Sequence, residues 1–176
     1  MKTFLALLAY LAASGTPAEH VRLPGPGGTM LDAALVRPAA ADPSKPAVVA
    51  LHGCGGPYAE RDGQWAAALA KAGHAVLLPD SFGSRGLESQ CRVKDRTVRP
   101  ERERRDDAIA AGAWLRAQPG VAPGGIVLMG WSNGGQTVLA TAKDGIGLPP
   151  GLFLRYVAFY PGCAAASRSQ GRTRRS

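Results

Sequence analysis

Histidine and cysteine are scarce in this sequence, which has three of each among 176 residues. Three cysteines permit one disulfide bond from three possible pairs and leave one thiol over. No apolar run reaches the roughly 20 residues that a membrane-spanning helix requires, so no segment of the mature chain is expected to span a bilayer. The shortage with the largest consequence for function concerns the residues after Ser132. They include one acidic residue, Asp144, and no histidine.

The first 18 residues have the features of a secretory signal peptide. Lys2 precedes an apolar stretch over residues 4–13, and small residues follow at 14–18, in the usual order of basic region, apolar region and cleavage site. An N-terminal membrane anchor is the alternative interpretation. No twin-arginine pair precedes the apolar stretch, which favours ordinary secretion. We therefore expect an exported protein, periplasmic or secreted, without stable membrane association after signal cleavage.

The opposite end, residues 164–176, contains four arginines and no large apolar residue. This composition predicts a disordered basic tail, because the segment cannot bury enough apolar surface to offset the entropy lost on ordering. Without these four arginines and Lys2, the net charge falls from +8 to +3, which does not indicate a nucleic-acid-binding protein. The remaining residues, 19–163, are long enough for one folded domain.

Within residues 19–163, short apolar runs alternate with segments of helical periodicity. Strands are expected at 20–23, 30–37, 47–51, 74–78, 126–129 and 156–160, and helices at 61–72, 100–118 and 134–142. This alternation is typical of the α/β class with a largely parallel sheet. The polar segment 81–99 between two of these elements is expected to be a functional loop.

The predicted helix that begins at Pro100 is rich in charge. We interpret the arginines from Arg99 to Arg105 as a charged face in contact with solvent. The residues expected to face inward are Ile109, Ala113 and Trp114.

The strongest functional signal is Gly130-Trp131-Ser132-Asn133-Gly134, a G-x-S-x-G pattern between a predicted strand and a predicted helix. In a nucleophile elbow this turn exposes the serine hydroxyl in a strained conformation, and flanking glycines avoid collisions. We therefore predict that Ser132 is a catalytic nucleophile and that Gly130 and Gly134 are the elbow glycines. The backbone N–H of Asn133, at the start of the following helix, is one expected oxyanion donor.

The second oxyanion donor is expected from the loop after the strand 47–51, which reads His52-Gly53-Cys54-Gly55-Gly56 and is close to the lipase and esterase pattern. Gly53 or Cys54 would supply the N–H group. His52 itself is an alternative candidate for the missing base, but its place beside Gly53 favours a structural role in shaping this loop.

Because Cys54 lies in a glycine-rich loop with a function of its own, we expect the disulfide bond to join the other two cysteines, Cys91 and Cys163.

The remaining titratable residues have ordinary structural interpretations. We expect His74 to be satisfied at the start of a buried strand, His20 to be exposed, Asp80 to hold a loop and Asp144 to lie on the surface. Tyr58 stands where a third glycine would complete a dinucleotide-binding fingerprint, so that motif fails. No cofactor and no metal site are predicted.

Four motifs give the chain a resemblance to the α/β-hydrolase superfamily and, within it, to the dienelactone hydrolase family. They lie at 51–56, 78–86, 129–135 and 158–163, and the resemblance covers about residues 20–163. It implies a three-layer sandwich and an esterase or lactonase that acts on a small-molecule ester or lactone. The name-giving enzymes use a cysteine nucleophile, whereas this chain has Ser132, as many exported relatives do. By position, Arg85 is a candidate to bind a substrate carboxylate.

Members of this family continue past the strand at 156–160 with two further strands, whose ends carry the aspartate and the histidine of a catalytic triad. Here the pattern stops at Cys163, and the residues beyond resemble a different reading frame or the end of a truncated gene model. The sheet is therefore expected to lack its last strands and to end in an apolar, uncovered edge strand.

The sequence supports three hypotheses for function. The first is an exported serine hydrolase in which Ser132 attacks an ester or lactone carbonyl. The second, favoured for the chain as written, is a catalytically inert fragment of such an enzyme, because the base is missing. The third is a non-enzymatic binding protein that uses the strand-end cleft or the basic tail, with a polyanion or a membrane surface as partner.

Overall fold

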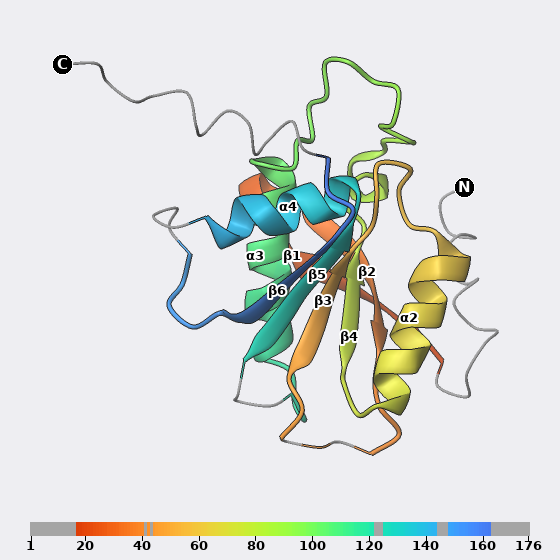
Figure 1. The fold of residues 1–176 in the computed structure, drawn as a ribbon, viewed down its shortest axis with the longest axis vertical. Helices are drawn as coiled ribbons and strands as arrows, with labels where there is room; N and C mark the ends of the chain where they lie inside the picture. The colour runs from red at the N-terminus through yellow and green to blue at the C-terminus, as the bar shows by residue number, and fades with distance from the viewer. Residues whose placement is uncertain (1–16, 41, 43, 122–124, 144–147, 163–176) are drawn as a thin grey trace.

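Figure 1 shows the computed structural model of the chain, in which helices cover both faces of one mixed sheet. The structure describes residues 17–40, 42, 44–121, 125–143 and 148–162. The predicted basic tail, most of the predicted signal peptide, Asp144 and Cys163 lie outside the described residues. None of the helices in the described ranges is long and apolar enough to cross a membrane.

The sheet has six strands in the order β1-β2-β4-β3-β5-β6. They are β1 (Glu19–Pro24), β2 (Met30–Val36), β3 (Ala47–Leu51), β4 (Val76–Pro79), β5 (Ile126–Trp131) and β6 (Phe153–Phe159). Strands β4, β3, β5 and β6 run parallel, and the β1–β2 hairpin joins them through an antiparallel pairing of β2 with β4. The four parallel strands therefore end at the same edge of the sheet (Figure 1), which confirms the predicted mostly parallel α/β architecture.

Helices lie on both faces of the sheet because its parallel strands are apolar on both sides. The helices are α2 (Ala59–Lys71), α3 (Glu103–Arg116) and α4 (Asn133–Ala142). On one face, Ala70 of α2 joins a buried cluster with Met129 of β5. On the other face, Leu115 of α3 and Val138 of α4 join a cluster with Leu128 of the same strand. The result is three layers, with α2 opposite α3 and α4 (Figure 1).

The structure confirms the predicted elements and moves several of their ends. Helix α2 begins at Ala59 instead of Arg61, and α3 begins at Glu103 instead of Pro100, after a series of turns. Strand β6 begins at Phe153, which pairs with Ile126 of β5. That pairing depends on the neighbouring strand, so the local pattern of residues 153–155 did not reveal it.

The inward face of α3 differs from the predicted one. Ile109 and Trp114 are partly buried against the core, but Ala113 is exposed. Moreover, Arg104 is 0% exposed and Arg105 8% exposed, so the interpretation of these arginines as a solvent-facing surface was wrong. It assumed that every charged side chain of the helix meets solvent, whereas the interior supplies hydrogen-bond partners for Arg104.

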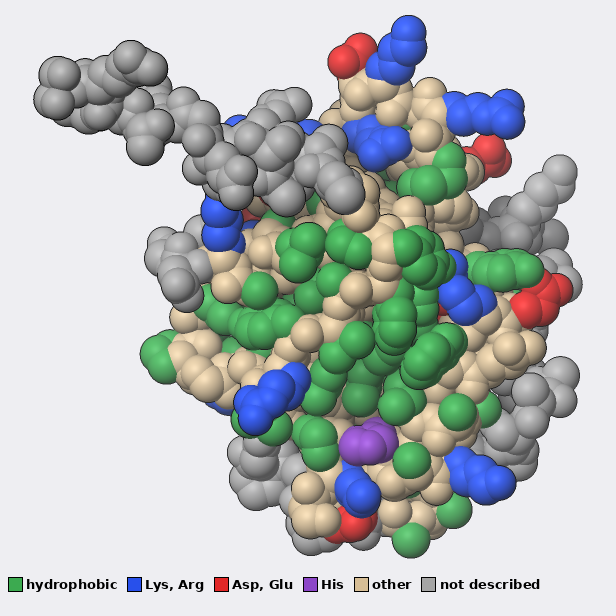
Figure 2. Space-filling model, in the orientation of Figure 1, with side chains coloured by type: hydrophobic (Ala, Val, Ile, Leu, Met, Phe, Trp, Pro, Cys, Tyr) green, Lys and Arg blue, Asp and Glu red, His purple; other side chains and the backbone are tan. Residues whose placement is uncertain are grey.

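Strand β6 forms one edge of the sheet, as predicted. Its side chains Leu154, Tyr156 and Val157 are 45%, 36% and 38% exposed. Figure 2 shows apolar side chains gathered on this side of the molecule. An exposed apolar edge strand can pair with a further strand. The exposed edge of β6 could therefore accept an additional strand.

Candidate active site

The carboxyl ends of the parallel strands bring together the residues that the sequence analysis selected. His52 and Gly53 follow β3, Asp80 follows β4, and Ser132 stands between β5 and α4. Ligands of open α/β sheets bind at this edge. The structure therefore gathers the predicted nucleophile and the predicted oxyanion loop at one place.

Ser132 has the strained backbone of a nucleophile elbow. Its φ is 53° and its ψ is −111°, a region that residues other than glycine rarely adopt. Its N–H donates to the carbonyl of Phe159 at 3.0 Å, and its carbonyl accepts from the N–H of Gln136 at 2.9 Å. These bonds anchor the turn between β5 and α4 to the end of β6 and to the first turn of α4, and Ser132 itself is half-buried. Strain held in place by its surroundings is typical of functional sites.

Gly130 and Gly134 allow the elbow to pack against neighbouring backbone. A Cβ atom on Gly134 would lie 2.3 Å from the carbonyl oxygen of Leu51 and 2.6 Å from that of His52. A Cβ atom on Gly130 would lie 2.6 Å from the carbonyl oxygen of Gly134. Neither position has room for a side chain, which agrees with the role that the elbow motif gives these glycines.

The loop after β3 lies directly beside Ser132. A Cβ atom on Gly53 would be 3.8 Å from the Cβ atom of Ser132, so the backbone at Gly53 borders Ser132. Asn133 is buried and begins α4, which places its N–H at the positive end of the helix dipole. The structure thus brings together the three predicted parts of the site: the nucleophile and both oxyanion donors.

His52 is buried, and both of its ring nitrogens are engaged. Nδ1 lies 2.7 Å from the carbonyl oxygen of Gly53, and Nε2 lies 3.2 Å from the backbone nitrogen of Ser81. A carbonyl only accepts and a backbone N–H only donates, so the proton is on Nδ1. Burial, aided by the charges of Arg104 and Arg61, lowers the pKa of His52 well below its ordinary value of 6.5. His52 is therefore a neutral residue that shapes the loop.

Replacing His52 with glutamine is expected to weaken the pH dependence of stability. A histidine whose pKa is lowered by folding takes up its proton below pH 6.5 in the unfolded chain only, so wild-type stability falls as the pH falls. Between pH 7.5 and 5.5 this loss is on the order of 1 kcal/mol, and His52→Gln should lack it. Urea unfolding of both proteins at both pH values measures the difference. Asp80, Arg104 and Arg61 face His52 and remain in both proteins. If the free energy of unfolding changed equally with pH in both proteins, His52 would take up its proton in the folded wild type as well, which would contradict the prediction.

Asp80 holds the loop after β4, as predicted. Its Oδ1 accepts hydrogen bonds from the N–H groups of Phe82 at 3.0 Å and Gly83 at 2.8 Å. Burial raises the pKa of Asp80, and these two bonds oppose the rise. No cluster of three or more histidine, cysteine or acidic side chains that could hold a metal ion occurs in the part of the chain that the structure describes.

Arg85, the candidate for binding a substrate carboxylate, is paired inside the protein. Its two terminal nitrogens donate to the carboxylate of Asp107 at 2.9 and 2.8 Å, and Nη1 also donates to the carbonyl of Ser81. The side chain of Asp107 is 0% exposed. Arg85 therefore neutralises a buried carboxylate and fastens the loop after β4 to α3, and this arrangement does not support the substrate-binding role.

The sequence analysis missed Arg104, which lies in the first turn of α3 beneath the site. Its Nη1 donates to Oδ1 of Asn133, and its Nη2 donates to the carbonyl oxygen of His52 at 2.8 Å. Burial lowers the pKa of Arg104 from its ordinary value to about 10, and the charges of Asp107 and Asp80 oppose this. Arg104 remains protonated at neutral pH and contacts residues on both sides of the predicted oxyanion site.

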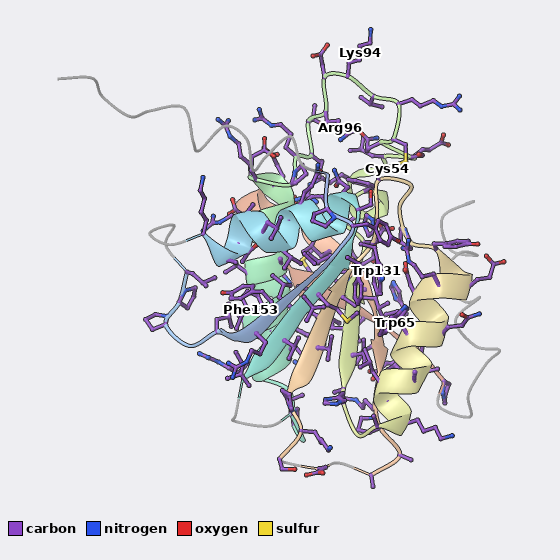
Figure 3. All side chains as sticks on the ribbon, viewed as in Figure 1. Cys54, Trp65, Lys94, Arg96, Trp131 and Phe153 are labelled. Atoms are coloured by element: carbon purple, nitrogen blue, oxygen red, sulfur yellow. A yellow bond between two sulfur atoms is a disulfide. The ribbon has the colours of Figure 1, made fainter. Side chains whose placement is uncertain are left out.

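The disulfide bond joins Cys54 and Cys91, whose Cα atoms are 4.8 Å apart, so the predicted pairing of Cys91 with Cys163 was wrong. That prediction treated a role of Cys54 in the oxyanion loop as a reason against a disulfide. However, the side chain of Cys54 can form a disulfide bond while its backbone N–H remains free to serve as a donor in the loop. The bond ties the oxyanion loop to the long polar loop that carries Lys94 and Arg96 (Figure 3).

Aromatic side chains support the elbow on the α2 side of the sheet. The ring of Trp131 lies 5.9 Å from that of Trp65 (Figure 3). It lies 5.8 Å from the ring of Phe159. The guanidinium of Arg61 lies 4.8 Å above the ring of Trp131, and its Nη1 would be 3.9 Å from a Cβ atom on Gly53. Trp131, the residue before Ser132, is thus packed between side chains of α2 and β6.

The sequence model of the dienelactone hydrolase family matches residues 31–173. This range contains the elbow, the oxyanion loop and all of α2, α3 and α4. The chain belongs to the dienelactone hydrolase family. Membership confirms the resemblance drawn from the four motifs, and it places this chain among hydrolases.

Solved structures of other hydrolases share the fold of this dienelactone hydrolase family member. Dipeptidyl peptidase 4 of Porphyromonas gingivalis is 25% identical, with a TM-score of 0.56 over 78% of this chain and 20% of that chain. A puromycin-hydrolyzing peptidase of Mycobacterium tuberculosis is 28% identical, with a TM-score of 0.56 over 78% and 22%. The bacterial brefeldin A esterase is 24% identical, with a TM-score of 0.53 over 78% and 40%, and shows the fold alone. This chain aligns with 20% to 40% of the length of these proteins.

Proposed function

We propose that this chain carries the nucleophile and the oxyanion donors of a serine hydrolase that acts on carboxylic esters or lactones. The observation that carries the proposal is the strained backbone of Ser132 at a strand-to-helix turn, with the Gly53 loop beside it. Membership in the dienelactone hydrolase family supports hydrolysis of a small molecule.

In this reaction, Ser132 Oγ attacks the carbonyl carbon, and the electron pair of the carbonyl moves to its oxygen. The N–H groups of Asn133 and of Gly53 or Cys54 donate to this oxyanion. Collapse of the intermediate breaks the bond to the alcohol oxygen, which receives the proton that Ser132 gave up, and leaves an acyl-serine. Water then releases the acid and restores the hydroxyl. With a lactone, the alcohol and the acid are two ends of one product.

Attack requires a base for the proton of Ser132. The three histidines all precede Ser132, and each has contacts elsewhere: His20 with Asp32, His52 within its loop, and His74 with the carbonyl of Pro46. We propose that the base and its carboxylate partner belong to a downstream segment in family members that have one, and that this chain alone turns over slowly. Loss of the histidine in subtilisin lowers kcat by about 10⁶.

A fluorophosphonate probe tests the nucleophile. Ser132 Oγ would form a bond to phosphorus as fluoride leaves, and the phosphoryl oxygen would occupy the oxyanion site. Because the three histidines have contacts elsewhere, we expect slow labelling of the wild-type chain and none of Ser132→Ala, which keeps the Cβ atom and the backbone conformation. Mass spectrometry of the intact protein and of its peptides measures both. Ser81→Ala changes a buried serine after β4, which is separated from β5 by β3, and should label like wild type. Labelling that persists in Ser132→Ala, or an unlabelled folded wild type, would contradict the proposal.

A catalytically inert hydrolase scaffold is the second candidate, favoured by the contacts that hold all three histidines. It predicts that a nitrophenyl ester is hydrolysed no faster by wild type than by Ser132→Ala. A binding function of the basic tail instead predicts salt-sensitive binding to a polyanion that disappears on deletion of residues 164–176, with Ser132 irrelevant.

We also propose that the protein is exported to the periplasm or secreted. The Cys54–Cys91 disulfide supports this, because such bonds persist in oxidising compartments. Recovery of a chain that lacks residues 1–18 from periplasm or medium would agree, and a full-length chain confined to the cytoplasm would not.

A further inference from the structure

Arg104 is among the largest fully buried side chains of the described residues. It extends from α3 beneath the turn that holds Ser132, and its guanidinium lies 5.0 Å from the ring centroid of Phe82. Removing a guanidinium from water is costly, and apolar replacements of buried ions often leave stability unchanged or raise it. A charge at this place therefore needs an explanation besides packing.

The hydrogen bonds of Arg104 differ from those of its charged neighbours. Arg85 and Arg105 donate to the carboxylates of Asp107 and Asp106, so these pairs neutralise charge. Arg104 instead donates to two neutral oxygens, the carbonyl of His52 and the side-chain amide of Asn133. These oxygens belong to the two segments that supply the proposed oxyanion donors.

The first of these bonds determines where the N–H of Gly53 points. His52 and Gly53 share a trans peptide unit, in which the carbonyl and the N–H point in opposite directions. Because Arg104 holds the carbonyl of His52 in the interior, the N–H of Gly53 is directed away from the interior. Gly53 borders Ser132 on that loop.

The second bond holds Asn133, the residue that follows the nucleophile. The amide nitrogen of Asn133 also donates to Oε1 of Gln136, and its backbone carbonyl accepts from Thr137. Asn133 is therefore fixed on α4 and linked to Arg104 through Oδ1. A guanidinium is planar, with its two terminal nitrogens at a constant separation, so one rigid group spans both segments.

We propose that Arg104 is a positioning residue that sets the two oxyanion donors, the N–H groups of Gly53 and Asn133, at a constant separation. This inference rests on the proposed function for its catalytic meaning. Lysine keeps the positive charge, but its single ammonium group cannot reproduce the two separate donor nitrogens of the guanidinium.

Arg104→Lys in the full chain tests the proposal through the rate of fluorophosphonate labelling. A displacement of about 1 Å at a catalytic group, or loss of one oxyanion donor, reduces rates by about 100-fold. We expect Arg104→Lys to label about 100-fold more slowly than wild type. Arg105→Lys makes the same change at the next residue of α3, and it should label at the wild-type rate. Urea unfolding of each variant shows that folded proteins are compared.

Amide relaxation by NMR provides a readout that needs no reactivity. We expect the order parameters of the Gly53 and Asn133 N–H groups to fall from about 0.85 toward 0.6 in Arg104→Lys, while those of β3 and β5 stay unchanged. If wild type is not labelled, the proposed function fails, and the order parameters still decide the role of Arg104.

Wild-type labelling together with unchanged Gly53 and Asn133 order parameters in folded Arg104→Lys would overturn the proposal. If Arg104→Lys does not fold, Asn133→Ala removes one acceptor and leaves Arg104 in place. We then expect a fall in the order parameter of residue 133, a smaller change at Gly53, and labelling at least about 10-fold slower. Unchanged labelling and unchanged order parameters in that variant would equally overturn it.

Discussion

Replacement of Cys91 with serine should lower the free energy of unfolding by about 4 kcal/mol, because the Cys54–Cys91 bond closes a loop with a sequence separation of 37. The bond restricts the unfolded chain, and without it the unfolded state gains entropy. For a domain of this size the melting temperature should fall by about 8–16 °C. Urea and thermal unfolding under non-reducing conditions measure both quantities.

Two comparisons isolate the contribution of this disulfide. A reducing agent should bring wild type to the stability of Cys91→Ser and leave the variant unchanged. Cys163→Ser removes the cysteine outside the observed pair and should unfold like wild type under both conditions. A Cys91→Ser variant as stable as oxidised wild type would show that the bond does not form in solution.

Replacement of Gly134 with alanine should destabilise the protein by about 3 kcal/mol, the upper part of the usual range for overpacking. The new Cβ atom would lie 2.3 Å from the carbonyl oxygen of Leu51 and 2.6 Å from that of His52. These are backbone atoms of β3 and of the oxyanion loop, so no side-chain rotation relieves the contact. The melting temperature should fall by about 6–12 °C, as measured by circular dichroism.

Gly55→Ala is the matched control for this change. Gly55 lies in the same glycine-rich loop, and a Cβ atom there would meet nothing within 4 Å. It should therefore unfold within about 0.5 kcal/mol of wild type. A Gly134→Ala variant as stable as Gly55→Ala would contradict the close packing of the elbow against the end of β3.

The elbow illustrates how much of a site a local pattern can predict. Apolar residues before Ser132, helical periodicity after it and glycines on either side are features of one short stretch, and they fixed its place between β5 and α4. The oxyanion loop was predicted in the same way from the residues after β3. The edge position of β6 was predicted from a motif that ends at Cys163, whereas the family model matches up to residue 173.

Arg104 shows where local patterns fail. A charged residue in a charged segment carries no sign of burial, although Arg104, Ala108, Ala111 and Leu115 share the helical spacing of an inward face. The prediction followed large apolar residues instead and so selected Ala113, which is exposed. The bonds that make burial of Arg104 tolerable come from His52 and Asn133, both far away in the sequence.

Composition, periodicity and two short motifs were enough to predict an α/β chain with a candidate serine elbow and a candidate oxyanion loop, because strand, helix and tight turn are encoded by neighbouring residues. Tertiary structure alone decided which cysteines pair and that Arg85 forms an ion pair with Asp107. It also decided that Arg104 links the loop after β3 to the start of α4. Each of those contacts joins segments that come together only in the folded sheet, where β3, β4 and β5 lie side by side. Burial and pairing of these residues therefore depend on the tertiary fold and leave no local signal in the sequence.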